Sequence, residues 1–121
     1  MDKITYLSLP YTFNPELSFA IANEIAAKFM LEGDIVFSPI SHCHELSNYI
    51  PREQRNTSEF WLKQDIPMLK RCDELVVVII DDEGMRLIKD SVGCQAEIQC
   101  AIENDIHIRY YRYNLAYSVN Y

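Results

Sequence analysis

No cluster of lysine or arginine stands in this sequence of 121 residues, where 18 acidic side chains outnumber 11 basic ones and the formal net charge is −7. A surface that binds duplex nucleic acid needs concentrated cations to neutralise phosphates, so we expect no duplex nucleic acid as a partner. A small anionic ligand is still compatible with this charge, because a few backbone N–H groups can hold one locally.

Long apolar runs are also missing. Residues 1–3 lead straight into a strand-like run without the apolar core of a signal peptide, and no stretch approaches the length of a membrane span. The absence of a Cys-x-x-Cys spacing favours reduced thiols, and we expect a cytoplasmic protein with no membrane partner. The four cysteines are Cys43, Cys72, Cys94 and Cys100.

The elements that are present alternate between strand and helix, in a chain whose length fits a single domain, 1–121. Asn14-Pro15 is typical of a helix start, and Gly33 of the cap that ends the helix. We expect the polar segment 40–56 to be a loop or a short broken helix, and 81–90 to be a loop. The predicted strands are 3–8, 35–37, 74–80 and 107–111, and the later helices are about 58–72 and 92–103.

This alternation predicts an α/β fold, a three-layer, Rossmann/flavodoxin-like parallel sheet flanked by helices. Residues 75–80 form a continuous apolar run, which is typical of a central strand covered on both faces. In such sheets ligands bind at the carboxyl ends of the strands, so we expect a site near the loops that follow Ser8, Phe37 and Ile80.

The last predicted helix carries a carboxylate on its apolar face. Glu97 lies three residues after Cys94 and four before Ala101, on a stripe that also includes Ile98 and Ile102. A carboxylate facing the sheet needs a partner, water or a chemical task, because burying an unpaired charge is expensive.

The helix predicted at 58–72 repeats this pattern. Asp65 interrupts its apolar stripe, so the two acids could meet over one substrate. Either carboxylate could instead complement a helix dipole or cap a loop. The stripe consists of Leu62, Ile66, Leu69 and Cys72.

The residues before Glu97 allow two interpretations. Asp90 and Ser91 occupy positions typical of a helix cap, and Gly93 follows in the first turn. Free N–H groups beside a small residue would also permit close approach by an anion or a sugar hydroxyl.

Taken together, these residues resemble the nucleoside 2-deoxyribosyltransferase-like superfamily over most of the chain, from Tyr6 to about Tyr110. The segment 38–44, Ser-Pro-Ile-Ser-His-Cys-His, resembles a bacterial and phage branch of it. The matching pieces are Tyr6-Leu7-Ser8-Leu9-Pro10-Tyr11, then Asp65 with Cys72-Asp73-Glu74-Leu75-Val76-Val77-Val78, and last Gly93, Glu97, Ile98 and Ala101.

The resemblance implies catalysis by two carboxylates. Glu97 would attack the anomeric carbon of the sugar, Asp65 would protonate or orient the leaving base, and water or a second base would resolve the glycosyl-enzyme. It implies neither a metal nor a cofactor, and it places Tyr6 and Ser8 among the substrate-binding residues.

Ser91 departs from the pattern of the transferases, which commonly carry an acid six positions before the catalytic glutamate. Members that hydrolyse 2′-deoxynucleoside 5′-monophosphates resemble the chain better, because they have a serine there that contacts the phosphate. The resemblance therefore favours an N-glycosidase that acts on nucleotides. The acidic segment 81–90 could instead repel a phosphate or supply the missing acid.

Two histidines fall in the segment 40–56. His44 is a candidate substrate-binding residue, whereas His42 and Cys43 fit a polar surface loop. A metal site at these residues would lack a second cluster of ligands elsewhere in the chain. We expect Trp61 to pack in the core or on a pocket wall.

The C-terminal segment is rich in tyrosine, and so much aromatic area is seldom left exposed on a monomer. The resemblance also implies oligomers in which a neighbour's C-terminal residues complete the pocket. We therefore expect a homodimer or a higher homo-oligomer. The tyrosines are Tyr110, Tyr111, Tyr113, Tyr117 and Tyr121.

Three functions are compatible with the sequence. The first is an enzyme that acts on the N-glycosidic bond of a small-molecule nucleoside or nucleotide, by hydrolysis or by transfer. The second is a non-catalytic module that binds or senses nucleotides on the same fold, and the third is a structural subunit of an oligomer. The presence of both Asp65 and Glu97 favours the enzyme, and a structural subunit leaves the two acids unexplained.

Overall fold

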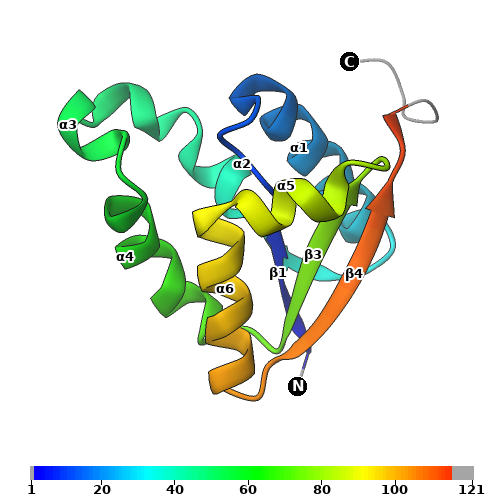
Figure 1. The fold of residues 1–121 in the computed structure, drawn as a ribbon. Helices are drawn as coiled ribbons and strands as arrows, with labels where there is room; N and C mark the ends of the chain where they lie inside the picture. The colour runs from blue at the N-terminus through cyan, green and yellow to red at the C-terminus, as the bar shows by residue number, and fades with distance from the viewer. Residues whose placement is uncertain (1, 116–121) are drawn as a thin grey trace.

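The sheet of this protein is parallel throughout and carries helices on both faces (Figure 1). In the computed structural model, which describes residues 2–115, the strand order is β2-β1-β3-β4. This is the predicted three-layer arrangement, with α1 on one face and α4, α5 and α6 on the other. The elements are β1 (Ile4–Ser8), α1 (Pro15–Leu31), β2 (Ile35–Phe37), α2 (Pro39–Cys43), the 3₁₀ helix η1 (Leu46–Tyr49), α3 (Arg52–Arg55), α4 (Ser58–Leu69), β3 (Glu74–Ile80), α5 (Gly84–Asp90), α6 (Val92–Glu103) and β4 (His107–Tyr113).

β3 is the central strand that its apolar run predicted. It pairs with β1 on one side and with β4 on the other, and its residues 75–78 are completely buried. Both faces of a parallel strand are covered by helices, which explains why its sequence is continuously apolar rather than alternating.

The alternation of side chains along β1 divides its residues between the two faces. Leu7 packs into the core beneath α1, whereas Tyr6 and Ser8 face α4 and α6. Successive side chains of a strand point to opposite faces, so residues two apart share a face. This register places two hydroxyl groups beneath α6.

The signals that predicted the start and end of α1 are confirmed. The side chain of Asn14 accepts a hydrogen bond from the N–H of Leu17 at 3.2 Å, and Pro15 occupies the first turn. Gly33 adopts φ +98° just after the helix, where glycine is favoured. No helix within residues 2–115, α1 included, has the length and apolar character needed to cross a membrane.

The prediction of a loop over residues 81–90 is wrong, because Gly84–Asp90 forms the helix α5. Gly84 indicated a turn, but its role here is close packing. A Cβ atom at this position would lie 2.5 Å from Cγ2 of Ile79, so only glycine lets the helix begin directly against β3. Of the acidic residues of this segment, Asp90 lies on the helix, whereas Asp81, Asp82 and Glu83 form the turn before it.

The end of one predicted helix and the apolar face of another also need correction. α4 ends at Leu69 instead of Cys72, because the chain turns there so that the N–H of Asp73 can donate to the carbonyl of Ile4 at 2.8 Å. On α6, Ile102 is 59% exposed. Ile102 lies five residues after Glu97, which is about 140° around a helix of about 3.6 residues per turn, so it points away from the face that contains Glu97.

The segment 40–56 was predicted to be either a loop or a short broken helix, and it is a short broken helix. It contains the end of α2, then η1 and α3, which lie beside the carboxyl end of the sheet (Figure 1). This segment follows the short edge strand β2 and leads into α4, so it forms one side of any site at that end.

Two of the C-terminal tyrosines are covered within the chain. Tyr111 packs edge-on against Phe29 with ring centroids 5.1 Å apart, and the buried Tyr113 donates a hydrogen bond to Glu24. The argument for an oligomer from exposed aromatic area therefore fails for these two, whereas Tyr110 is 49% exposed. Tyr117 and Tyr121 lie outside the described residues, and the oligomer stays a prediction.

A buried acid links neighbouring strands at the amino-terminal end of the sheet, opposite the end where the carboxyl termini of the strands lie. Glu74, whose side chain is 5% exposed, accepts from Arg109 at 3.2 Å, Lys3 at 3.3 Å and Thr5 at 3.2 Å. Burial alone would raise the pKa of Glu74, but the hydrogen bonds and charges of Arg109 and Lys3 outweigh it and lower the pKa. The ionised form is thus stabilised only in the folded protein.

We expect Arg109→Met to lower the free energy of unfolding at pH 7 by about 1–3 kcal/mol, because it removes a charged donor from a buried carboxylate. The lowered pKa of Glu74 makes this contribution complete above the unfolded value of about 4.3, and it disappears as the pH falls. Urea unfolding at pH 7 and at about pH 3 measures the difference.

The matched control is Arg86→Met, which breaks only exposed ion pairs with Glu83 and Asp90 and should change stability by less than about 1 kcal/mol. An equal loss for Arg109→Met at both pH values would contradict the assigned role of Glu74.

Candidate active site

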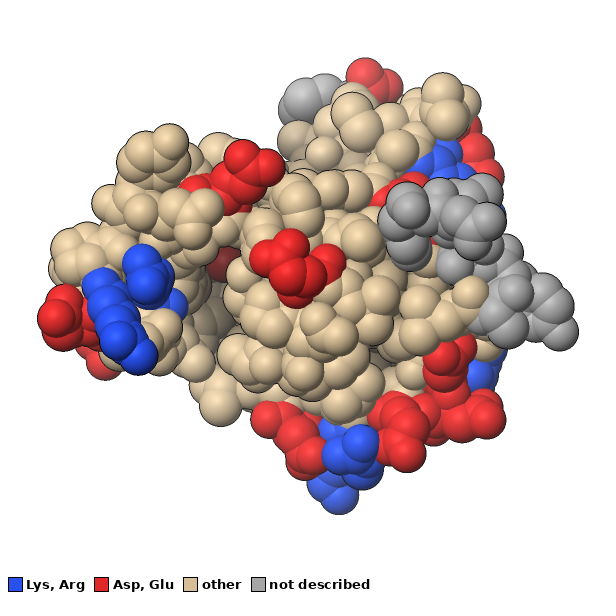
Figure 2. Space-filling view, turned by 90° about the horizontal axis from the view of Figure 1, so that it is seen from above, with Lys and Arg blue, Asp and Glu red and all other residues tan. Residues whose placement is uncertain are grey.

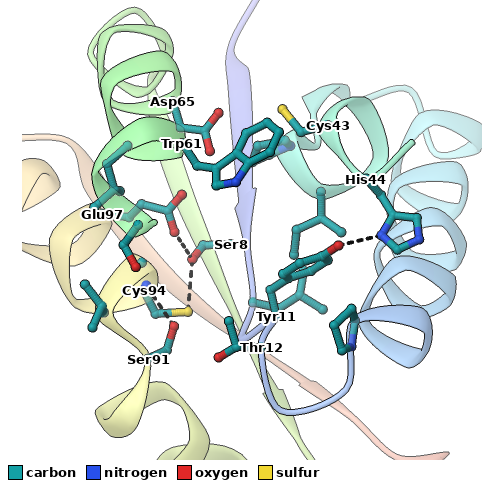
Figure 3. A pocket seen from close by; sticks show the side chains of 18 of the residues that line it. Ser8, Tyr11, Thr12, Cys43, His44, Trp61, Asp65, Ser91, Cys94 and Glu97 are labelled. Atoms are coloured by element: carbon teal, nitrogen blue, oxygen red, sulfur yellow. Dashed lines mark hydrogen bonds between the residues drawn. The ribbon is translucent and has the colours of Figure 1, made fainter. Parts of the chain in front are cut away.

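A cavity of about 390 Å³ opens at the carboxyl end of β1, where the parallel sheet was expected to place a ligand. Its size falls within the range of small-molecule sites. The walls come from the residues that follow β1 and β2, from α2 and α4, and from the first turns of α6 (Figure 3). The segment after Ile80 reaches the cavity only at its far end, at Asp90.

The outer surface at this end of the molecule is hollowed beside a group of basic side chains (Figure 2). Figure 2 views the end from above and shows Lys and Arg side chains gathered at the left, over α3, with an acidic side chain visible inside the hollow. Arg55 of α3 lines the cavity together with Asp65 and Glu97. One side of the cavity therefore carries a cationic side chain, and the two acids lie in the same cavity.

Glu97 projects from α6 onto β1 and is 7% exposed, as its position on the apolar stripe predicted. Both of its carboxyl oxygens accept hydrogen bonds. Ser8 donates to one at 2.6 Å, and the hydroxyl of Tyr6 donates to the other. Burial raises the pKa of Glu97 to about 7, although these two hydrogen bonds act to lower it.

Asp65 projects into the same cavity from α4 (Figure 3). Its Oδ1 atom is buried and has no hydrogen-bond partner among the described residues. Burial raises the pKa of Asp65 to about 6, and the nearby His42 acts in the opposite direction. An orphaned carboxyl oxygen in a cavity is unusual, and a bound ligand would give it a partner.

Ser91 is both a cap and a cavity residue. Its hydroxyl accepts from the N–H of Cys94 at 3.1 Å, so it is the N-cap of α6. Ser91 and Gly93 also line the cavity. A Cβ at Gly93 would meet only the Ser91 hydroxyl, at 3.9 Å, so protein packing does not demand glycine there. The N-terminus of α6 is thus open to a ligand.

His44 lines the cavity on the side of α1 and α2, where its Nδ1 lies 2.6 Å from the hydroxyl of Tyr11. Tyr6, in contrast, is completely buried and is absent from the cavity wall. It lies behind Glu97 and holds that carboxyl from within the protein. Of the seven predicted site residues, six therefore line one cavity and Tyr6 supports it.

Several cavity residues were not among the predicted site. Tyr11 follows Pro10 in the loop just after β1, so its place in this loop was a usable signal. Trp61 lies one helical turn before Asp65 and forms a pocket wall, which was one of its two expected roles. The position of Arg55 depends on how the segment 40–56 folds, for which the sequence carries little periodicity.

His42 is exposed and its ring lies near that of Phe37, whereas Cys43 lines the cavity. Within residues 2–115, no three His, Cys, Asp or Glu side chains are placed together as metal ligands.

Two solved structures share this fold. The 2-desoxiribosyltransferase from Leishmania mexicana is 15% identical with a TM-score of 0.61, and the match covers 91% of this chain and 64% of that protein. A 2-deoxyribosyltransferase from Bacillus psychrosaccharolyticus, described as a biocatalyst for nucleoside synthesis, is 20% identical with a TM-score of 0.61. That match covers 97% of this chain and 77% of the other.

These likenesses confirm the fold that the resemblance implied, which this chain shares with two 2-deoxyribosyltransferases. No curated protein sequence matches the chain. A domain of unknown function, DUF1937, matches residues 3–112. Since this match takes in nearly the whole sequence, the chain belongs to the DUF1937 family.

Proposed function

We propose that this protein cleaves or exchanges the N-glycosidic bond of a nucleoside or a nucleoside 5′-monophosphate, with Glu97 as the nucleophile. The observation that carries the proposal is the pair of acids in one cavity. Glu97 has both oxygens held by hydroxyl donors, and Asp65 has a buried oxygen without a partner. The fold shared with two 2-deoxyribosyltransferases supports it.

In the first step the Glu97 carboxylate attacks the anomeric carbon and forms a glycosyl ester. The bond from that carbon to the base nitrogen breaks, and its electron pair leaves with the base. Asp65 gives its proton to the departing base and becomes a carboxylate. The hydrogen bonds from Tyr6 and Ser8 fix the direction in which Glu97 points, so the attacking oxygen is positioned before the substrate arrives.

In the second step the ester is resolved from the face that the base has left. The Asp65 carboxylate takes a proton from water, the water oxygen bonds to the anomeric carbon, and Glu97 is released as a carboxylate. A second base in place of water gives transfer. Two displacements at one carbon retain its configuration.

The reaction needs one proton on the two acids, held by Asp65. In the free protein burial raises the pKa of Glu97 to about 7 and that of Asp65 to about 6, so between these values the pair holds a single proton that lies mainly on Glu97. Substrate binding must therefore shift this proton to Asp65. A bound base removes water from Asp65 and favours its neutral form. The positive charge that develops on the sugar favours ionised Glu97.

The proposal also concerns whether the substrate carries a 5′-phosphate. Ser91 and Gly93 at the open N-terminus of α6, together with Arg55, support a phosphate in the cavity. Asp90 also lines the cavity and would repel it. Paired assays of nucleosides and their 5′-monophosphates decide between the two substrate classes.

We expect the protein to release free base from at least one member of a panel of nucleosides and 5′-monophosphates, and Glu97→Gln to release none above the uncatalysed rate. The reason is that an amide cannot form the glycosyl ester. Chromatography of the free base is the measurement, and adding a second, labelled base separates transfer from hydrolysis.

The control Glu103→Gln changes an exposed acid of the same helix and should retain full activity. Release of base by Glu97→Gln at the wild-type rate would overturn the assignment. If the wild-type protein binds nucleotides but releases no base from any of them, it is a non-catalytic binding module.

We expect a bell-shaped dependence of kcat/KM on pH, with limbs near the pKa values of about 6 and about 7. At low pH both acids are protonated and Glu97 cannot attack. At high pH both are ionised and no proton is available for the base. Asp65→Asn should lower kcat by about 10²- to 10⁴-fold and remove the alkaline limb.

Glu59→Gln, an exposed acid on the same helix as Asp65, is the matched control and should keep both limbs. Persistence of the alkaline limb in Asp65→Asn would show that another group supplies the proton.

A further inference from the structure

Tyr11, His44 and Glu16 form a continuous hydrogen-bonded series, and the first two lie on the cavity wall that faces Glu97 and Asp65 (Figure 3). The hydroxyl of Tyr11 lies 2.6 Å from Nδ1 of His44, and Nε2 of His44 lies 3.1 Å from Oε1 of Glu16. The mechanism proposed above uses none of these three residues.

The position of the imidazole ring is closely determined. His44 stacks on Phe19 with ring centroids 4.2 Å apart and an interplanar angle of 19°, and its side chain is only 13% exposed. Its backbone carbonyl accepts from Ser47 at 2.6 Å, which holds the chain at this point. The ring is therefore held with Nδ1 toward Tyr11 and Nε2 toward the exposed Glu16.

Glu16 determines which nitrogen carries the proton in the neutral ring. A carboxylate only accepts hydrogen bonds, so the nitrogen that faces it, Nε2, must be the N–H. Nδ1 is then a bare acceptor, and Tyr11 must donate its only proton to it. The Tyr11 oxygen is left with lone pairs and no proton to offer.

We propose that Tyr11 meets the ligand as a hydrogen-bond acceptor, fixed in that role by His44 and Glu16, and so selects a ligand with a hydroxyl or amino donor at this wall. A carbonyl or phosphate oxygen at the same place would face a second acceptor without a proton between them. Tyr11 is the specificity-determining residue, and His44 and Glu16 are positioning residues.

This inference deepens the proposed function, on which it rests for the class of ligand. Glu97 and Asp65 stand on one wall and Tyr11 on the other (Figure 3). The Glu97 carboxylate on one side and the Tyr11 oxygen on the other are acceptors, and they favour an uncharged, hydroxyl- or amino-bearing portion of the nucleoside between them. Any phosphate would then lie at the N-terminus of α6 instead of beside Tyr11.

The first test uses matched ligands that differ by one donor, with binding measured by calorimetry in a Glu97→Gln background so that no turnover occurs. One pair is an adenine nucleoside and the purine nucleoside that lacks its 6-amino group, and the other is a nucleoside with and without its 3′-hydroxyl. We expect the donor-bearing member of at least one pair to bind about 3- to 10-fold tighter. Adding Tyr11→Phe should bring that ratio close to one.

Tyr49→Phe, which changes an exposed tyrosine outside the cavity, is the control and should keep the ratio. Glu16→Lys places a donor in front of His44 while altering only an exposed side chain, and we expect it to reduce the preference as well. A preference that survives Tyr11→Phe unchanged would overturn the proposal.

The second test needs no ligand and no activity. Nitrogen-15 NMR of the histidine rings tests the tautomer directly, with the His44 signals identified by their loss in His44→Gln. When the His44 ring is neutral, Nε2 should carry the proton and Nδ1 should carry none. A proton on Nδ1 would overturn the proposal. Because this result is independent of catalysis, a protein with the expected tautomer and no base release would contradict the proposed function alone.

Discussion

The contact between β1 and α6 through Glu97 is the constraint on which the site depends. A buried carboxyl is costly unless its oxygens are paired, and here Tyr6 and Ser8 supply both donors. These donors share a face because they are two residues apart on a strand. The strand therefore provides the hydroxyl donors and the helix provides the carboxyl. Without the other element, the polar groups of either one would be buried without hydrogen-bond partners.

The topology brings the second acid to the first. The chain leaves β2 at the sheet edge, passes through α2, η1 and α3, and returns over β1 as α4 (Figure 1). Asp65 on α4 and Glu97 on α6 consequently face one cavity, although they lie far apart in the sequence. The loop after β1 closes the other side with Tyr11. The cavity thus has an acidic wall and a facing wall that carries the hydrogen-bonded pair Tyr11 and His44.

Periodic patterns in the sequence predicted the regular part of this structure. The strands, the parallel sheet and the inward position of Glu97 all follow from apolar spacing, and the ends of α1 follow from its caps. The helix at 84–90 was missed because Gly84 has two opposite uses, as a turn residue and as a residue for close packing. The contact between Tyr11 and His44 joins two irregular segments, and no periodicity records such a contact.

The central claim is that Glu97 forms a covalent bond to the sugar. Substrates with a 2′-fluoro substituent destabilise the cationic transition state, slow both steps and allow an ester to accumulate. Mass spectrometry of the intact protein, followed by peptide mapping, measures this directly. The account predicts an added mass of one sugar, carried by the peptide that contains Glu97 and absent from Glu97→Gln. Base release from such a substrate without any sugar attached to the protein, or with the sugar attached to another residue, would contradict it.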